Sequence, residues 1–304
     1  MRDVDLVVIG AGVAGLTAAL FAARHGLKVA VIEQLGAGGQ ISNAERIENF
    51  PGFPQGIAGH ELGPLLHQQA EGAGADFVLD TVQALELDGA HRIVRGASET
   101  LRGRAVIIAA GSALRSLGVP GEETFLGRGV SHCASCDGAF FASRPVCVAG
   151  GGDSALDEAL LLAEHAAHVT IIHSGERLDA QQALQDRIAG NSKIELVLNT
   201  VIEEIIGDAA VAGVRLRDLK SGSARLLEVK GAFVYIGLEP NTAWLQGVLA
   251  LDGAGHIATD INMATSLAGV FAAGDIRQHS VAQLAAAAGD GATAAIAAVR
   301  YLAK

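Results

Sequence analysis

The stretch from Leu6 to Leu16 (LVVIGAGVAGL) decides the fold of the N-terminal part of the chain. An apolar strand runs directly into the glycine pattern G-x-G-x-x-G, and a helical run follows as far as His25. The first glycine of such a pattern permits a tight turn, the second lets the backbone approach a pyrophosphate, and the third lets the helix pack closely on the strand. The stretch therefore predicts a dinucleotide-binding unit with four contact residues, Gly10, Gly12, Ala14 and Gly15.

Glu33 strengthens this interpretation. A second apolar strand, Lys28 to Ile32, follows the helix and ends directly before Glu33, which lies 18 residues after Gly15. A carboxylate at about this distance binds a ribose hydroxyl in dinucleotide-binding folds. The glycines alone indicate only a tight turn, whereas the strand, turn, helix, strand and acid together indicate a nucleotide site.

The same pattern returns about midway along the chain, at Val146–Leu156 (VCVAGGGDSAL). It carries G-x-G-x-x-A, and it continues into a helix to about His165 and a second strand, His168 to His173. Two fingerprints of this kind predict two nucleotide-binding units in one chain. The expected nucleotide contacts of the second unit are Gly150, Gly152, Asp153, Ser154, Ala155 and Glu158.

Between the two fingerprints lies a second chemical motif, Cys133–Gly138 (CASCDG). Two cysteines separated by two residues can close a small disulfide ring or open to a dithiol, and this setting commonly lowers the pKa of a thiol. Asp137 follows the second cysteine directly and is a candidate proton donor and acceptor for thiol chemistry. The segment therefore predicts a redox site formed by Cys133, Cys136 and Asp137.

A zinc site is the main alternative for these cysteines. Zinc takes four ligands, usually from a second C-x-x-C or a pair of histidines. The only other cysteine is Cys147, inside an apolar strand where a core position is the expectation, and His132 lacks a partner at the usual spacing. The pattern therefore favours redox chemistry over metal binding.

The composition limits the classes of partner. The chain has 304 residues, 50% of them hydrophobic, with a formal net charge of -11. An acidic chain without a basic run is not expected to bind nucleic acid or an anionic membrane. No apolar run has the length of a membrane span, the first residues do not form a secretion signal, and three cysteines do not make a disulfide framework. These features predict a cytoplasmic protein of two domains.

Helices are expected at residues 58–73 and 285–302, and short strand-like runs fill most of the remaining chain. The runs between residues 76 and 95, and those between 194 and 237, are each interpreted as an antiparallel meander, with a turn at 238–242. A strand at 269–275 ends at Asp275. Its carboxylate either accepts a hydrogen bond from a ribose or ribityl hydroxyl or caps the segment that follows, and the residues alone leave both roles open.

Taken in order, these motifs resemble low-molecular-weight thioredoxin reductases over nearly the whole chain. Further matching stretches are Gly38–Gln40, Glu48–Gly52, Gly237–Thr242 and Gly269–Asp275. The resemblance implies an α/β fold with two Rossmann-like, three-layer ββα dinucleotide-binding domains. The implied FAD-binding domain is discontinuous in sequence, with residues 1–114 and 243–304, and residues 115–242 form a nucleotide-binding-like domain that carries the C-x-x-C pair. A homodimer is implied as well.

The resemblance also implies the activity of a thioredoxin-disulfide reductase. FAD would pass electrons to the Cys133–Cys136 disulfide, and the dithiol would reduce a thioredoxin-like partner through a mixed disulfide. Cys136 would be the thiol nearest the flavin, Cys133 the attacking thiol and Asp137 the acid–base group. The further FAD contacts implied are Gly39, Gln40, Asn49, Ala110, Gly111, Gly274, Asp275 and Gln283. Directly before Gln283 the chain departs from the family, with Val-Ala in place of the usual Tyr-Arg.

A larger departure lies beside the second fingerprint. Family members that use NADPH carry His-Arg-Arg-x-x-x-Arg after the second strand, whereas this chain has His173–Asp179 (HSGERLD). A 2′-phosphate needs Arg or Lys to offset its desolvation, and only Arg177 remains, out of register. We therefore expect NADPH to be a poor substrate and NADH to be possible, with Glu176 receiving the 2′-hydroxyl.

The residues are also compatible with electron donors other than a nucleotide. If the nucleotide pocket is abandoned, a protein such as ferredoxin would supply the electrons, or the enzyme would run backwards as an oxygen-dependent dithiol oxidase. The retained glycine pattern and Glu158 favour a nucleotide. A flavin reductase of the ferredoxin–NADP type is disfavoured because such relatives lack the C-x-x-C pair, and the same pair argues against a non-enzymatic flavin-binding module.

Overall fold

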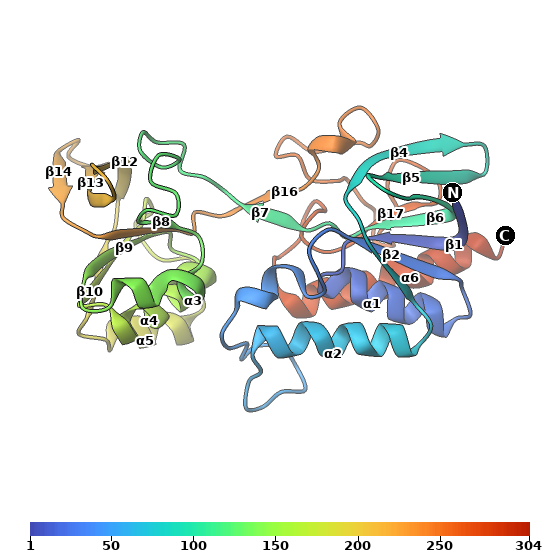
Figure 1. Cartoon of the computed structure of the whole chain (residues 1–304), viewed down its shortest axis with the longest axis horizontal. Coiled ribbons are helices and arrows are strands. Elements are labelled where there is room, and N and C mark those ends of the chain that lie inside the picture. Colours follow the sequence, from blue (N-terminus) through green and yellow to red (C-terminus); the bar gives the residue numbers. More distant parts are fainter. The chain divides into compact units, whose positions relative to one another are not determined.

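The computed structural model describes residues 1–304 except for the side chain of Asn43. The chain divides into two compact units, and each contains both helices and strands (Figure 1). Unit 1 comprises Met1–Ala113 and Glu239–Lys304, and unit 2 comprises Leu114–Leu238. The expected domain ends at residue 114 and resumes at residue 243, so its boundaries differ from those of unit 1 by one and four residues.

Unit 1 contains one large sheet and three long helices. Its elements in chain order are β1 (Arg2–Ile9), α1 (Val13–Arg24), β2 (Val29–Glu33), the 3-10 helix η1 (Gly39–Asn43), α2 (Gly59–Gly72), β3 (Asp76–Leu79), β4 (Val82–Asp88), β5 (His91–Gly96), β6 (Thr100–Ile108), η3 (Ala243–Leu245), β17 (Val270–Ala272) and α6 (Leu284–Leu302). The three helices expected from the sequence are therefore confirmed as α1, α2 and α6.

The fingerprint strand β1 lies at the centre of the unit 1 sheet, paired in parallel with β2 and with β6. Successive residues of β1 face opposite layers. Leu6 and Val8 pack into the core on the helix side, and Val7 and Ile9 pack into the core on the other side. Because both faces are covered, the strand is continuously apolar, as buried parallel strands are.

Helices α1, α2 and α6 lie on one face of this sheet (Figure 1). The small residues of α1 and α6 allow their backbones to approach closely. A side chain at Gly291 would overlap the backbone carbonyl of Ala14, so the position excludes anything larger than glycine. The close approach brings the C-terminal helix beside the first glycine turn.

The meander expected at residues 76–95, in unit 1, has a different set of strands from the prediction. Of its three expected strands, only β4 and β5 pair antiparallel with each other, and β5 also pairs antiparallel with the first half of β6. The second half of β6 pairs in parallel with β17. The run at Asp76–Leu79 was expected in the meander, but as β3 it extends the parallel sheet beyond β2. The prediction failed there because periodicity identifies a strand but not its partner.

Unit 2 repeats the plan of unit 1 on a smaller scale. Its elements are β8 (Val130–Ser131), α3 (Ala134–Asp137), η2 (Gly138–Phe141), β9 (Pro145–Ala149), α4 (Asp153–His165), β10 (His168–Ile172), α5 (Gln182–Ala189), β11 (Ile194–Val197), β12 (Thr200–Gly207), β13 (Val211–Asp218), β14 (Ala224–Leu227) and β15 (Gly231–Val234). The sheet order is β11-β10-β9-β15-β8, and every pairing in it is parallel.

The strand β9 again alternates between two cores. Val146 and Val148 face the side of α4 and α5, whereas Cys147 and Ala149 face the antiparallel sheet β12-β13-β14. The second expected meander was therefore too large, because β11 and β15 belong to the parallel sheet and only β12–β14 form the meander. Each unit thus has helices on one face of a parallel sheet and antiparallel strands associated with it, the three-layer arrangement that the motifs implied.

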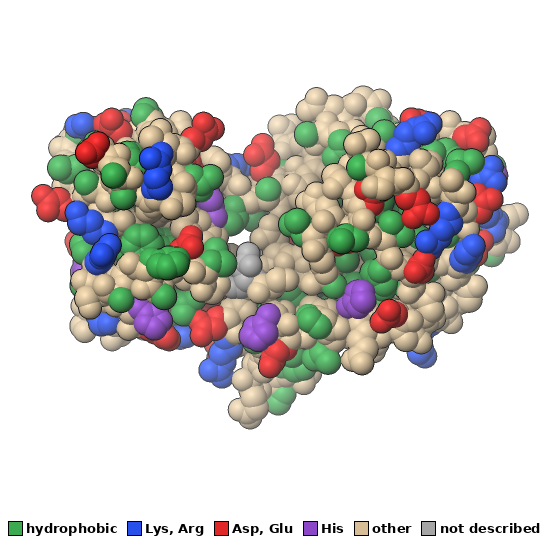
Figure 2. All heavy atoms as spheres, viewed as in Figure 1, with side chains coloured by type: hydrophobic (Ala, Val, Ile, Leu, Met, Phe, Trp, Pro, Cys, Tyr) green, Lys and Arg blue, Asp and Glu red, His purple; other side chains and the backbone are tan. Residues whose placement is uncertain are grey.

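The chain passes between the units through β7 (Ser112–Leu114) and β16 (Leu238–Pro240). These two strands pair as a small sheet of their own, so the segment at 238–242, which was expected as a turn, begins with a short strand. Among the described residues, the helices are all too short or too polar to cross a membrane. On the face drawn in Figure 2, basic and acidic side chains are interspersed over both units.

Candidate active site

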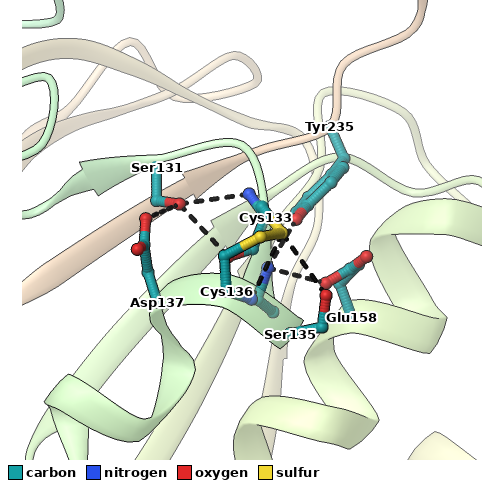
Figure 3. Close-up of a disulfide and its surroundings, with 8 residues drawn as sticks. Ser131, Cys133, Ser135, Cys136, Asp137, Glu158 and Tyr235 are labelled. Carbon is teal, nitrogen blue, oxygen red and sulfur yellow. Dashed lines mark hydrogen bonds between the residues drawn. A yellow bond between two sulfur atoms is a disulfide. The ribbon is translucent and has the colours of Figure 1, made fainter. Parts of the chain in front are cut away.

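The predicted disulfide between Cys133 and Cys136 is present, with Cα atoms 5.3 Å apart. Cys133 is the N-cap of the short helix α3, and its sulfur accepts a hydrogen bond from the backbone N–H of Cys136 at 3.2 Å. The hydroxyl of Ser135 lies 3.3 Å from the same sulfur (Figure 3). Both contacts place partial positive charge at Cys133, which favours a thiolate there once the disulfide opens.

Asp137 is held on one side of the disulfide by Ser131, at the end of β8. The Ser131 hydroxyl donates to Asp137 Oδ2 at 2.6 Å and accepts from the backbone N–H of Cys133 at 3.1 Å. The predicted acid–base residue is therefore linked to the first cysteine through a single hydroxyl (Figure 3). This arrangement limits the positions that the carboxylate can take.

A second carboxylate approaches the disulfide from the opposite side. The backbone N–H of Ala134 donates to Glu158 Oε2 at 2.9 Å and to the hydroxyl of Tyr235 at 3.1 Å. Tyr235 also hydrogen bonds to Glu158, and its burial, together with this carboxylate, raises the pKa of the phenol. Glu158 was expected at the nucleotide; the structure brings its side chain to the redox helix.

The three cysteines differ sharply in environment. Cys136 is exposed and Cys133 is half-buried, so both redox sulfurs reach the surface of unit 2. Cys147 is fully buried in β9, and burial raises the pKa of its thiol to about 12. The expectation that Cys147 is a core residue is confirmed, and thiol chemistry is confined to the C-x-x-C pair.

In unit 1 the first glycine turn is tightly built. A Cβ at Gly15 would overlap the carbonyl oxygen of Gly10, and a Cβ at Gly10 would overlap that of Ala109. At Gly12, in contrast, no atom lies within 4 Å of an added Cβ. Gly12 is the N-cap of α1 and has no side chain that could accept from the first N–H groups of the helix. The turn thus fits a pyrophosphate at Gly12.

Glu33 lies at the end of β2, beside this turn. One carboxylate oxygen accepts from the backbone N–H of Ala11 at 2.8 Å. The other accepts from the backbone N–H groups of Gln34 and Leu35. The carboxylate is therefore fixed against the glycine turn, where the ribose of a dinucleotide is expected.

Other expected FAD contacts gather around the same turn. An added Cβ at Gly39 would lie 3.2 Å from Gly12 Cα, and one at Gly274 would lie 2.9 Å from Ala14 Cβ. Gln40 donates to the carbonyl of Ser112 at 2.7 Å. These distances bring residues from four separate segments of the sequence into one region of unit 1.

Asn49 and Gln283 are 234 positions apart in sequence, yet the Asn49 amide donates to Gln283 Oε1 at 3.1 Å. Ala110 accepts at its carbonyl from Asn241 Nδ2 at 2.8 Å, and the backbone of Gly111 has a positive φ of 60°. The Ser112 hydroxyl that follows is buried and has no hydrogen-bond partner within the protein. A polar ligand such as a flavin would satisfy such a group.

Asp275 is not a helix cap. The N-cap of α6 is Gln283, eight positions later, and the Asp275 carboxylate accepts from the Ser280 hydroxyl at 3.0 Å. Burial raises the pKa of Asp275. The capping alternative is therefore wrong for α6, and a half-buried acid remains that can bind a ligand hydroxyl. Beside it, Asp290 of α6 accepts from the backbone N–H of Gly274 and pairs with Arg277.

The second glycine turn has the same construction. A Cβ at Gly150 would overlap the carbonyl oxygen of Tyr235 and lie 2.9 Å from Ala155 Cβ. A Cβ added at Gly152, in contrast, would have no atom within 4 Å. Gly152 is the N-cap of α4 and again makes no side-chain cap. Asp153 accepts two hydrogen bonds from Gln181, and Ser154 is exposed at the helix start. The turn thus remains open at Gly152, where a pyrophosphate would approach.

A pocket of about 530 Å³ follows β10, at the place of the missing arginines. It is lined by His173, Ser174, Gly175, Glu176, Arg177 and Asp179. Glu176 Oε1 lies 2.8 Å from the ammonium group of Lys220, in the turn between β13 and β14, and this contact lowers the pKa of Glu176. Arg177 is therefore not the only cation near the site, as the sequence had suggested. Lys220 was missed because it lies more than forty positions away.

A family model described as pyridine nucleotide-disulphide oxidoreductase matches residues 4–291 of the chain. A thioredoxin reductase of Mycolicibacterium smegmatis is 44% identical over 301 residues, which cover 99% of this chain and 97% of that protein. The chain belongs to the pyridine nucleotide-disulphide oxidoreductase family. Two crystal structures, the thioredoxin reductases of Lactococcus lactis and T. acidophilum, match 99% of both chains with TM-scores of 0.96 and 0.95 at 38% and 35% identity.

Within this oxidoreductase family, the chain is a low-molecular-weight thioredoxin reductase-like flavoprotein. Family membership establishes FAD and a pyridine nucleotide as the cofactor types, and Cys133–Cys136 is the disulfide that fits redox activity. The resemblance drawn from the motifs and the predicted fold class are thereby confirmed.

Besides Lys220, three residues of the candidate site were not found from the sequence: Ser131, Tyr235 and Arg277. Ser131 lies two positions before Cys133, and a polar residue that near a redox cysteine was an available signal. Tyr235 lies within an apolar run and resembles any core aromatic residue. Only its position beside Glu158 and Ala134 reveals a role.

Proposed function

We propose that the chain is an NADH-preferring reductase of a thioredoxin-like protein disulfide. NADH binds at the glycine turn of unit 2, residues 115–242 forming the nucleotide-binding-like domain. FAD binds at the glycine turn of unit 1, residues 1–114 and 243–304 forming the FAD domain. The bound flavin supplies the electron pair that opens the Cys133–Cys136 disulfide. The dithiol then reduces the partner by thiol–disulfide exchange.

The chain's own groups have distinct roles in this proposal. Cys136 exchanges electrons with the flavin, Cys133 attacks the partner disulfide, and Asp137 moves the proton between thiol and solvent. The Ser131 hydroxyl holds Asp137 at 2.6 Å and the Cys133 backbone at 3.1 Å, which keeps the acid–base group in fixed relation to the attacking sulfur. Exposure of the C-x-x-C sulfurs at the surface of unit 2 supports a macromolecular disulfide as the electron acceptor.

The preference for NADH is carried by the pairing of Glu176 with Lys220. A 2′-phosphate brings about two negative charges at neutral pH and needs cations that are not already neutralised. Lys220 lies 2.8 Å from Glu176, and Asp179 also lines the pocket. NADPH must separate that ion pair and bring its phosphate near both carboxylates. A 2′-hydroxyl, in contrast, donates to Glu176 and leaves the pair in place.

Anaerobic titration of the flavin absorbance tests the donor. The purified holoenzyme is titrated separately with NADH, NADPH and reduced ferredoxin. NADH is expected to bleach the flavin at stoichiometric amounts, and the reduced enzyme is then expected to reduce thioredoxin. A tenfold preference for NADPH, or reduction by ferredoxin alone, contradicts the donor assignment.

The oxidase alternative predicts a different result. In that case the dithiol form of the enzyme transfers electrons to the flavin and consumes oxygen without any nucleotide. The intact pocket after β10 and the open turn at Gly152 support nucleotide-driven reduction instead.

We also propose that the chain forms the homodimer that the family resemblance implies. Size-exclusion chromatography with light scattering tests this oligomeric state.

A further inference from the structure

Glu158 and Tyr235 contact the backbone inside the C-x-x-C ring, although neither side chain has a role in the exchange chemistry described above. Glu158 belongs to α4, and Tyr235 directly follows β15. Their shared partner is the N–H of Ala134, the residue that immediately follows Cys133. Figure 3 shows both side chains directed at this segment, opposite Ser131 and Asp137.

We propose that Glu158 and Tyr235 form a positioning pair that sets the acidity of the thiols released when the Cys133–Cys136 disulfide opens. The inference rests on the proposed function, because it concerns the reduced state of the same redox pair. Opening the disulfide adds two electrons and two protons, breaks the S–S bond and leaves two thiols. The electrons come from the flavin in turnover or from dithiothreitol in the test below.

The hydrogen bonds between this pair and Ala134 have a defined direction. The Ala134 N–H donates to Glu158 Oε2 at 2.9 Å and to the Tyr235 hydroxyl at 3.1 Å. The phenol in turn bonds to the Glu158 carboxylate, to which it can only donate while the carboxylate is ionised. Two donors therefore point at the carboxylate of Glu158, which lies one peptide unit from Cys133.

The charge of the Glu158 carboxylate acts on the nearby thiols. An anion near a thiol disfavours the thiolate and raises the thiol pKa. The titratable groups around the pair are Asp137 on α3, Glu158 on α4, Tyr235 after β15 and His132 directly before Cys133. Tyr235 is buried and remains a neutral phenol, because burial and Glu158 both raise its pKa. Its hydroxyl reduces the field of Glu158 by donating to it.

Substitutions at Glu158 and at Tyr235 are therefore expected to shift the thiol pKa in opposite directions. In Glu158→Gln the amide oxygen still accepts from Ala134 N–H, but the charge is gone. The pKa of the more acidic thiol is expected to fall by about half to one unit. In Tyr235→Phe the ring remains packed while the carboxylate loses a donor, so the same pKa is expected to rise by a few tenths of a unit.

Site-resolved alkylation measures these shifts. The holoenzyme is reduced with dithiothreitol, desalted anaerobically and treated with iodoacetamide from pH 5 to 10, and modification of Cys133 and Cys136 is followed by peptide mass spectrometry. Below the pKa, Glu158→Gln is expected to react about three to ten times faster than the parent. Glu164→Gln, an exposed carboxylate on the same helix, is the control and is expected to match the parent.

If the positioning pair serves only to stabilise the fold, a different outcome is expected. In that case both variants lose thermal stability while their alkylation profiles superimpose on that of the parent, and the inference is overturned. A downward shift in Tyr235→Phe also overturns it. Because alkylation needs neither NADH nor thioredoxin, these results are independent of the donor titration. The proposed function can therefore fail while this inference holds, and the reverse is also possible.

Discussion

The hydroxyl of Ser131 donates to the carboxylate of Asp137 at 2.6 Å, although neither residue lies between the two cysteines. The same hydroxyl accepts from the backbone N–H of Cys133 at 3.1 Å. The first cysteine of the redox pair and its expected acid–base group are thus fixed by one side chain. This contact restricts the motion of Asp137 while the disulfide ring opens and closes.

Ser131→Ala removes that link, and a slower thiol–disulfide step is expected. Loss of one charge-assisted hydrogen bond corresponds to about 1.5 kcal/mol, or roughly tenfold in rate, if the bond is needed in the transition state. Turnover with thioredoxin should fall by about this factor while flavin content stays at the parent level. Ser223→Ala, in the turn between β13 and β14, is the control. Unchanged turnover in Ser131→Ala contradicts the positioning role.

Cys136→Ser separates disulfide reduction from flavin reduction. Thioredoxin reduction is expected to fall by more than about a hundredfold, because a single thiol cannot re-form the disulfide. Electron transfer from NADH to ferricyanide should remain within about threefold of the parent. Cys147→Ala is the matched control, because its thiol is buried and its pKa is about 12. Thioredoxin reduction that survives in Cys136→Ser rules out the assigned disulfide chemistry.

Gly12→Ala and Gly15→Ala are expected to fail in different ways. A Cβ at Gly15 would overlap the Gly10 carbonyl, so this variant should unfold at lower temperature with or without FAD. A Cβ at Gly12 meets no protein atom within 4 Å and would instead occupy the space of the pyrophosphate. Gly12→Ala should therefore keep the melting temperature of the apoprotein and lose flavin. Calorimetry of apoprotein and the ratio of absorbance at 450 and 280 nm measure both effects.

Glu176→Gln is expected to shift the choice of nucleotide. The substitution releases Lys220 from its ion pair and removes a carboxylate from the pocket. The ratio of kcat/KM for NADPH to that for NADH should rise about five- to twentyfold. Lys220→Ala serves as the opposing variant, because it leaves Glu176 unneutralised and should lower the same ratio. Identical ratios in both variants and the parent exclude this pair as the specificity determinant.

Asp275→Asn is expected to stabilise the apoprotein at neutral pH. Burial raises the pKa of Asp275 above its ordinary value of 3.8, so the folded state binds this proton more tightly than the unfolded state does. The wild-type apoprotein therefore loses stability as the pH rises through the window above 3.8, and the asparagine variant does not. The melting temperature at pH 7 should rise by about 2 °C and the difference should vanish below pH 4, while FAD affinity falls.

Asp80→Asn is expected to change stability in the opposite direction from Asp275→Asn. Backbone N–H groups of Glu99 and Ser98, in the loop between β5 and β6, lower the pKa of Asp80 by donating to its side chain. Its contribution to stability is present above the ordinary aspartate pKa and is lost as the pH falls through the lowered folded value. Asp80→Asn should therefore destabilise the protein at pH 7. Melting temperatures of the two variants measured in parallel between pH 3 and 8 check both signs.

Much of the fold was predictable because its signals are local. The apolar run of β1, the glycines of both turns and the length of α6 each follow from neighbouring residues, and all were expected. Strand partners were predicted less well, since β3, β11 and β15 are apolar runs whose pairing depends on the whole sheet. Propensity and periodicity carry no information on that choice.

The sequence by itself determined the two nucleotide-binding fingerprints, the redox character of Cys133 and Cys136 and the absence of the usual arginines after β10. Each of these depends on residue types at short spacing, which can be read directly from the sequence. Only the tertiary structure decided that Glu158 and Tyr235 meet at Ala134 and that Lys220 neutralises Glu176. These partners lie between 24 and 101 positions apart and approach only through packing of the unit 2 sheet with its helices and meander, so no local pattern contains them.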